Sequence, residues 1–184
     1  MVFAYYNRLT RAEQRIYRKS DEVSSIPLTR PSSLQPLVGM LASTLKRDDR
    51  QMTKNMCQEL VSALTDGLKV PPVQVEVLAT RPSRSWGELQ GLYNPGKGHK
   101  AARITVWMRT AQRRQVVAFR SFLRTLLHEI CHHLDYELLR LADSFHTEGF
   151  YKRESSLFHQ LVGNQQEDLF KARADTLTGA EQKN

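Results

Sequence analysis

The sequence has few cysteines and no long uninterrupted apolar run. Its two cysteines, Cys57 and Cys131, are too few for a disulfide framework and form no CxxC pair, which favours a reducing compartment. No uncharged apolar stretch reaches about 18 residues, so we expect no membrane span. The N-terminus has neither the apolar run nor the small-residue cleavage site of a secretion signal. These absences predict a cytoplasmic protein without a membrane partner.

Acidic residues are nearly absent from residues 81–124, which hold ten Lys and Arg and a single acid, Glu88. This segment carries a net charge of +9 and the remainder of the chain −1, within a total of +8. Clustered positive charge either forms a solvated surface or attracts nucleic acid by releasing counterions from phosphates. We therefore treat Arg109, Arg113 and Arg114 as candidate nucleic-acid contacts, with a solvated surface as the alternative.

The length and composition fit one core. With 184 residues, of which 40% are hydrophobic, the chain can bury a single domain but not two full ones. Residues 1–46 have a basic amphipathic segment followed by a Pro/Ser-rich stretch, which predicts an N-terminal arm. Residues 47–163 form the predicted domain, and residues 164–184 form a polar C-terminal tail.

Hydrophobic periodicity predicts helices and a few strands in the central domain. We expect helices over about 48–68, about 112–141 and from 150 to near 163, and strands over 73–77, 88–93 and 103–108. These elements predict an α+β single domain, in which a small antiparallel or mixed sheet packs on the helix near residue 130. We expect strand 103–108 to lie at a sheet edge, where an extended substrate can add as a further strand.

The pentad His128-Glu129-Ile130-Cys131-His132 is an HExxH match within the predicted helix 112–141. Positions i and i+4 lie one turn apart on the same helix face, so His128 and His132 can bind one metal ion. On the 100° helical step, both histidines face away from the most apolar stripe. In zinc peptidases the intervening carboxylate, here Glu129, accepts a proton from water activated by the metal. The pentad therefore predicts a single Zn²⁺ as cofactor.

Catalytic zinc takes three protein ligands and leaves one position open, so a third donor must come from outside the helix. His146 follows a break in the apolar pattern and can return beneath the pair, whereas Glu154, inside the next predicted helix, is the competing donor. His133 points about 100° away from His132 and is a poor ligand. The metzincin pattern HExxHxxGxxH is absent, because Asp135 and Leu138 occupy its Gly and final His positions.

The HExxH pentad, followed 14 positions after His132 by His146-Thr147-Glu148-Gly149-Phe150, an HxxxF element, resembles the SprT-like metallopeptidases. The resemblance spans about Asp48 to Gly163 and implies a zincin-like fold, with the sheet packed on the HExxH helix. It implies zinc held by His128, His132 and His146, with Glu129 as the catalytic base. For the DNA-associated members of that family it implies cleavage of proteins on or crosslinked to DNA. The chain departs from many members in having too few cysteines for a C-terminal zinc ribbon and in its N-terminal arm.

From these residues we expect a zinc metalloendopeptidase that acts on protein or peptide substrates. A second electrophile for the oxyanion can come from Tyr151 or His133, and Asp135 is placed either to orient a ligand imidazole or as a solvated helix acid. The alternative function is a nucleic-acid-binding module in which the zinc is structural.

Overall fold

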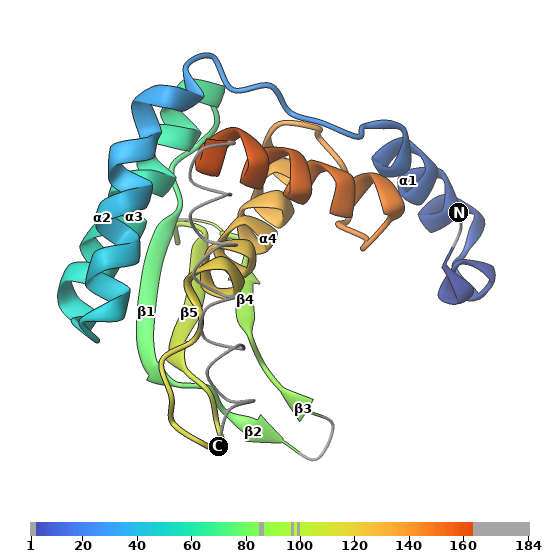
Figure 1. The fold of residues 1–184 in the computed structure, drawn as a ribbon. Coiled ribbons are helices and arrows are strands. Elements are labelled where there is room, and N and C mark those ends of the chain that lie inside the picture. The colour runs from blue at the N-terminus through green and yellow to red at the C-terminus, as the bar shows by residue number, and fades with distance from the viewer. Residues whose placement is uncertain (1–2, 85–86, 97, 99, 164–184) are drawn as a thin grey trace, which may run out of the picture.

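The computed structural model describes residues 3–84, 87–96, 98 and 100–163. Within them the chain forms an α+β fold around a three-stranded mixed sheet of order β1-β5-β4 (Figure 1). Strand β1 (Gln74–Thr80) runs parallel to β5 (Arg103–Arg109), and β4 (Gly91–Asn94) runs antiparallel to β5. A separate hairpin is formed by β2 (Ser83–Arg84) and β3 (Gly87–Glu88). The predicted α+β class and small mixed sheet are confirmed.

Two predictions about the strands are wrong. Strand β5 lies between β1 and β4 and is not an edge, whereas β4 is an edge of the sheet. The buried side chains of Ile104, Val106, Trp107 and Met108 explain the central place of β5, because a strand covered on both faces is continuously apolar. The strand expected over 88–93 is two short strands, β3 and β4, which belong to different sheets.

Helices α2 (Gln35–Lys46) and α3 (Arg50–Leu68) pack on each other, and α3 packs on β1 (Figure 1). The carboxylate of Asp49 caps α3 by accepting a hydrogen bond from the backbone N–H of Met52 at 3.0 Å. The helix ends at Lys69, whose φ of 56° is left-handed. Residues 35–46 fall within the predicted N-terminal arm, yet α2 buries side chains in the same core as α3: Val38, Leu41 and Leu45.

Helix α4 (Phe119–Glu137) carries the HExxH pentad and packs against β4 and β5. It is shorter at both ends than the predicted 112–141. Before it, the chain turns back on the end of β5, where Arg109 bridges Val116 and Arg114 has a left-handed φ of 52°. After it, Arg140 is left-handed at φ 53°. The polar and basic residues of the turn before α4 are also compatible with a helix. Periodicity alone therefore placed the start of α4 too early.

The N-terminal end of the described chain lies far from α2 and α3, whereas its last residue, Gly163, lies beside Gln35 at the start of α2 (Figure 1). A 3₁₀ turn, η1 (Ala4–Arg8), precedes α1 (Arg11–Glu22), and the 3₁₀ turn η2 (Pro31–Leu34) leads into α2. A C-terminal helix covers residues 148–163. The predicted tail, 164–184, lies outside the described residues. In the described part of the chain, no helix combines the length and apolarity needed to cross a membrane.

Candidate metal centre

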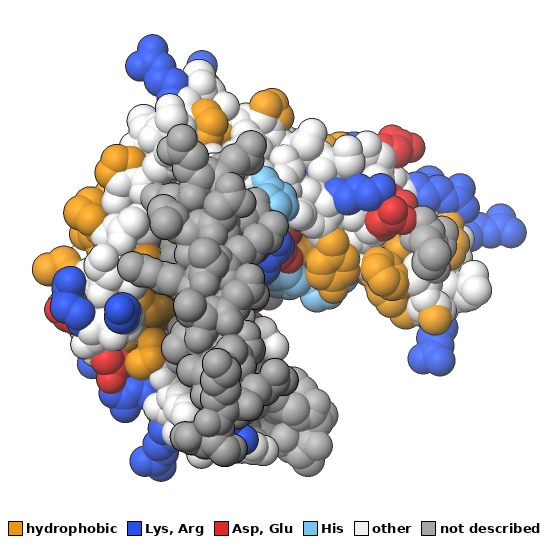
Figure 2. Space-filling view, viewed as in Figure 1, with side chains coloured by type: hydrophobic (Ala, Val, Ile, Leu, Met, Phe, Trp, Pro, Cys, Tyr) orange, Lys and Arg blue, Asp and Glu red, His pale blue; other side chains and the backbone are white. Residues whose placement is uncertain are grey.

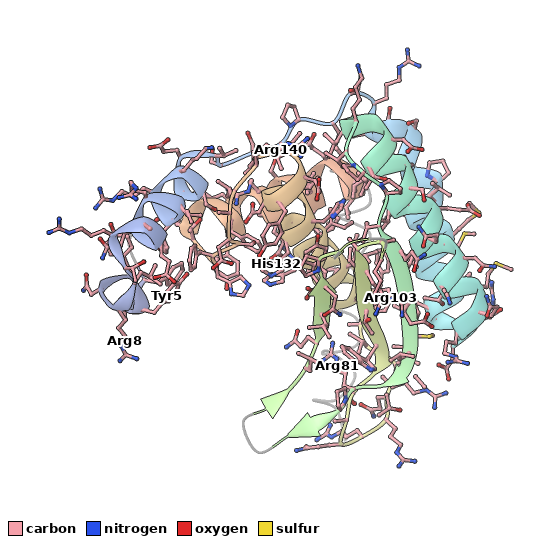
Figure 3. All side chains as sticks on the ribbon, turned by 180° about the vertical axis from the view of Figure 1, so that it is seen from behind. Tyr5, Arg8, Arg81, Arg103, His132 and Arg140 are labelled. Atoms are coloured by element: carbon pink, nitrogen blue, oxygen red, sulfur yellow. The ribbon has the colours of Figure 1, made fainter. Side chains whose placement is uncertain are left out.

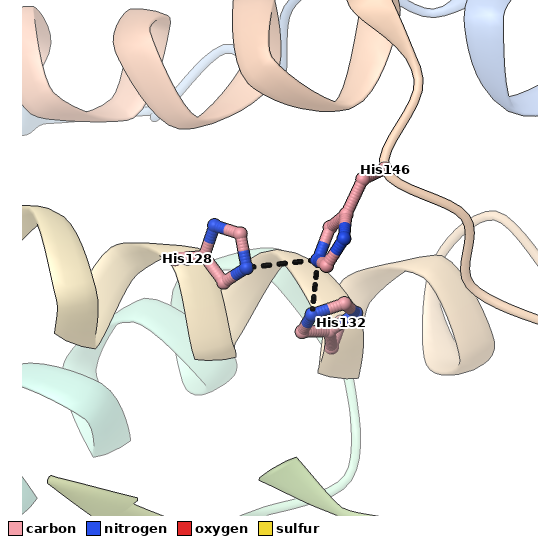
Figure 4. Close-up of side chains that lie close together, drawn as sticks. All are labelled: His128, His132 and His146. Carbon is pink, nitrogen blue, oxygen red and sulfur yellow. Dashed lines mark hydrogen bonds between the residues drawn. The ribbon is translucent and has the colours of Figure 1, made fainter. Parts of the chain in front are cut away.

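Three histidines meet at one point on the surface of α4. The Nε2 atom of His146 lies 2.9 Å from Nε2 of His128 and 3.1 Å from Nε2 of His132 (Figure 4). His128 and His132 are one turn apart on α4, and His146 comes from the segment between α4 and the C-terminal helix, residues 138–147, which we call the ligand loop. The three side chains lie close enough to hold a metal ion.

Hydrogen bonds on the far side of two rings fix which nitrogen faces the shared point. Nδ1 of His128 lies 3.2 Å from a carboxylate oxygen of Glu154, and Nδ1 of His132 lies 2.7 Å from Oγ of Ser144. Because Ser144 donates its own hydroxyl proton to Asp135 at 2.7 Å, its oxygen accepts from His132. Both imidazoles therefore carry their proton on Nδ1 and present an Nε2 lone pair to the shared point.

The donor set fits a divalent cation. Lone pairs of neutral imidazoles repel one another at about 3 Å unless a positive charge lies between them, and nitrogen ligands 2.0–2.1 Å from a tetrahedral Zn²⁺ are themselves about 3.3 Å apart. Protonation is the other way to relieve the repulsion, but burial and the neighbouring His128 lower the pKa of His132 to about 3 and also lower that of His146. A metal ion at the shared point would satisfy all three nitrogens at once.

Glu129 lies beside the three histidines but on the sheet side. Its side chain is only 5% exposed, and burial raises its pKa to about 7 against the opposing effects of His128 and of a backbone hydrogen bond from Tyr93. The carboxylate contacts Gly91 on β4 so closely that a Cβ there would lie 2.3 Å from Oε1 of Glu129. Gly91 thus allows the carboxylate to pack directly against the edge strand.

His133 is fully buried and has a partner on each ring nitrogen. Nε2 donates to the carbonyl of Pro71 at 2.8 Å, so Nδ1 accepts from the hydroxyl of Tyr93 at 3.0 Å. The ring therefore ties the edge strand to α4 and has no nitrogen available to an oxyanion. Of the two predicted electrophiles, only Tyr151 is accessible: its side chain is 43% exposed, and its ring centroid lies 5.9 Å from that of His146.

Asp135 is buried and acts on His132 through Ser144, not as a solvated helix acid. One oxygen accepts from Ser144, and the other accepts from the guanidinium of Arg153 at 2.7 Å. Neither Ser144 nor Arg153 was expected from the sequence. The available signal in the sequence was Arg153, which shares the apolar side of the C-terminal helix with Phe150 and Leu157. Because Arg is almost never fully buried without a partner, this position indicates a buried acidic partner.

Glu154, the competing third ligand, holds the opposite face of His128 and also pairs with Arg124 at 3.3 Å. Two cavities along β4 include residues of the centre, and both are lined by His128 and Glu129. One, of about 430 Å³, is lined by polar side chains that include Ser121, Arg124 and Glu154; the other, of about 350 Å³, reaches Leu92 and Tyr136. Figure 2 shows histidine side chains at the surface, on the side of the molecule that faces the N-terminal residues.

The three arginines named from the basic segment lie away from the histidines. Arg109 is paired with Asp48, which joins the end of β5 to the α2–α3 turn. Arg113 and Arg114 are exposed in the turn that precedes α4. The positive charge of this turn is therefore accessible, whereas that of Arg109 is partly neutralised.

Comparison of this chain with protein-family models, curated proteins and solved structures returns no match.

Proposed function

We propose that this protein is a zinc-dependent metalloendopeptidase of the SprT-like, zincin-like type, with His128, His132 and His146 as ligands and Glu129 as general base. The observation that carries the proposal is the convergence of three Nε2 atoms within hydrogen-bonding distance beside a buried carboxylate that follows His128 in an HExxH helix. A peptidase needs this combination, because metal and base must act on the same water molecule.

The composition of the centre supports a catalytic metal over a structural one. Structural zinc sites have four protein ligands, whereas three ligands leave a position for water or substrate. Within the described residues, the cluster holds three histidines, and His146 is exposed. When bound, zinc supplies a Lewis acid that polarises a carbonyl and lowers the pKa of water.

The residues around the ligands have distinct tasks. Burial raises the pKa of Glu129 to about 7. Its carboxylate accepts a proton from the attacking water and later passes it to the leaving amine. The hydroxyl of Tyr151 is the accessible donor for the oxyanion. Glu154 and Ser144 hold two ligand imidazoles in the tautomer that points Nε2 inward.

Strand β4 is the surface on which an extended peptide would bind. It lies at the edge of the sheet, and its Gly91 contacts Glu129. A peptide that adds to this edge by main-chain hydrogen bonds lies across the metal, with alternate side chains directed into the two cavities along β4. Recognition through the backbone favours unfolded or extended segments over one defined sequence.

The test is Glu129→Gln, assayed with a quenched-fluorescence peptide library and an unfolded protein. We expect kcat/KM to fall by about 10²–10⁴-fold because the base is lost, while zinc content, measured by elemental analysis, stays at one ion per chain. Glu137→Gln is the matched control, since Glu137 ends the same helix and pairs with Arg140 outside the centre. Undiminished cleavage by Glu129→Gln refutes the proposal.

Action on DNA-associated proteins is an extension of this proposal supported by the basic segment. The exposed Arg113 and Arg114 belong to residues 81–124, which carry a net charge of +9 against −1 for the remainder of the chain. If these residues contact phosphates, DNA affinity falls steeply with salt, and Arg113→Gln/Arg114→Gln flattens that dependence. Filter binding at two salt concentrations measures both. The same assay tests the alternative module with a structural zinc, which requires DNA binding without cleavage.

A further inference from the structure

The first residues of the chain contact the metal centre from outside. Figure 3 shows Tyr5, on the N-terminal turn, on the side of α1 that faces His132. We call residues 3–23 the N-terminal segment. Its contacts reach two of the three ligands by separate routes, one through side chains behind His132 and one through the backbone of His146.

The first route is a chain of buried polar contacts that starts at the end of α1. Arg153, 0% exposed, donates to the carbonyls of Ser20 and Val23 at 2.6 and 2.5 Å and to Oγ of Ser20 at 2.9 Å. The carbonyl of Ser20 also accepts from the N–H of the cap residue Val23 at 3.4 Å, and a cation at a helix C-terminus is favourable. Nη2 of Arg153, which donates to Oγ of Ser20, also donates to Asp135. Asp135 accepts from Ser144, and Ser144 accepts from His132, so the contacts continue to a metal ligand.

The second route holds the ligand loop and the start of the C-terminal helix. The hydroxyl of Tyr5 donates to the backbone carbonyl of His146 at 2.9 Å. The carboxylate of Asp21 accepts from the backbone N–H of Gly149 at 2.7 Å. Tyr17, 1% exposed, packs against Phe145, the residue between Ser144 and His146, with ring centroids 6.3 Å apart.

The fit between the two elements is tight at Gly149. A Cβ at this position would lie 2.5 Å from the backbone oxygen of Asp21, closer than real Cβ contacts come, and a backbone atom cannot rotate away. An alanine at position 149 would therefore push the N-terminal segment away from the C-terminal helix. A glycine of α2, Gly39, has no atom within 4 Å of the corresponding Cβ.

We propose that the N-terminal segment is a positioning element of the metal centre, which raises its metal affinity by holding Ser144 against His132 and fixing the backbone of His146. The inference rests on the metal site of the proposed function and not on peptide cleavage. Partners behind metal-binding histidines change metal affinity by about 10–100-fold when removed. Here those partners depend on a segment about 130 residues away in sequence, so the arm is part of the site.

The experiment measures zinc affinity of the full-length chain by competition with a chromophoric chelator. We expect Gly149→Ala to weaken zinc binding by about tenfold or more and Gly39→Ala to leave it unchanged, although both substitutions favour helix. Leu60→Ala is a second control, since it lowers stability in α3 and touches no residue of the centre. Tyr5→Phe removes only the bond to His146 and is expected to weaken binding several-fold.

Equal zinc affinity for Gly149→Ala and Gly39→Ala overturns the inference. If Gly149→Ala does not fold, Tyr5→Phe decides, and unchanged affinity for that variant overturns it. A weakening matched by Leu60→Ala also overturns it, because loss of stability would then explain the effect. Zinc binding without cleavage refutes the proposed peptidase alone, whereas an unmodified chain that binds no zinc refutes both.

Discussion

The half of the molecule formed by α2, α3 and β1 and the half that surrounds the histidines are held together by different forces. The first half is joined by apolar side chains such as Leu41, Leu60 and Val75, all 3% exposed or less. The second half adds long-range polar contacts to its apolar packing, and the buried pair of Arg153 and Asp135 is the central one. Apolar burial stabilises without fixing single atoms, whereas a hydrogen-bonded network fixes directions, which metal ligands need.

The largest effect should come from breaking the buried pair. Arg153→Met removes the partner of Asp135 and the donor to the end of α1, and leaves a carboxylate buried without a counter-charge. We expect the free energy of unfolding to fall by about 3–5 kcal/mol, measured by urea denaturation of the metal-free chain. A loss below about 1 kcal/mol would show that the pair does not hold the second half. Adding Asp135→Leu should recover part of the loss.

Truncating a core side chain in the first half should lower the free energy of unfolding by a comparable amount but leave zinc affinity unchanged. Leu60, on α3, is fully buried in the hydrophobic core. Leu60→Ala should therefore lower the free energy of unfolding by about 3 kcal/mol. Zinc affinity of the folded protein should not change. A tenfold loss of zinc affinity in this variant would contradict the separation between the two halves.

The next largest effect is a loss of catalytic activity at the edge strand β4, where the two halves meet. Gly91→Ala places a methyl group 2.3 Å from Oε1 of Glu129 and 2.8 Å from Cγ2 of Thr125, so the carboxylate must move. A displacement of about 1 Å at a reacting group lowers kcat/KM by about 10²-fold, and zinc content should stay at one ion. Steady-state kinetics with elemental analysis check both. Full activity would show that Glu129 does not act from this position.

The smallest effect is expected at a helix cap in the first half. Asp49→Ala removes the acceptor for the N–H of Met52 and should lower the free energy of unfolding by about 1 kcal/mol. Thermal and urea denaturation measure this change, and zinc affinity is again expected to stay constant. A loss of zinc affinity in Asp49→Ala would mean that the stability of α3 affects the metal centre.

The features predicted from the sequence are those with a local signal, and the features that were missed depend on contacts between distant residues. Helix α3, strand β1 and the buried stripe of α4 follow from apolar periodicity, which is a local property. His128 and His132 follow from helical spacing, and the structure brings His146 beside them. The partners Ser144, Arg153 and the N-terminal segment are defined by contacts between residues up to 141 positions apart, and no local pattern encodes such pairings.

The order of the strands in the sheet was also beyond the reach of local sequence patterns. Strand β5 was recognised by its composition, but its neighbours depend on how β1 and β4 meet across the chain. The start of α4 was misplaced because the left-handed backbone at Arg114, a residue type that rarely adopts it, ended the regular pattern without a glycine to mark the turn.

The zinc K-edge absorption spectrum of the zinc-loaded chain tests the central claim most directly. The account predicts three imidazole nitrogens and one oxygen at about 2.0 Å, with one nitrogen lost in His146→Ala. A shell of oxygens alone, a sulfur at about 2.3 Å, or an unchanged spectrum in His146→Ala would contradict it.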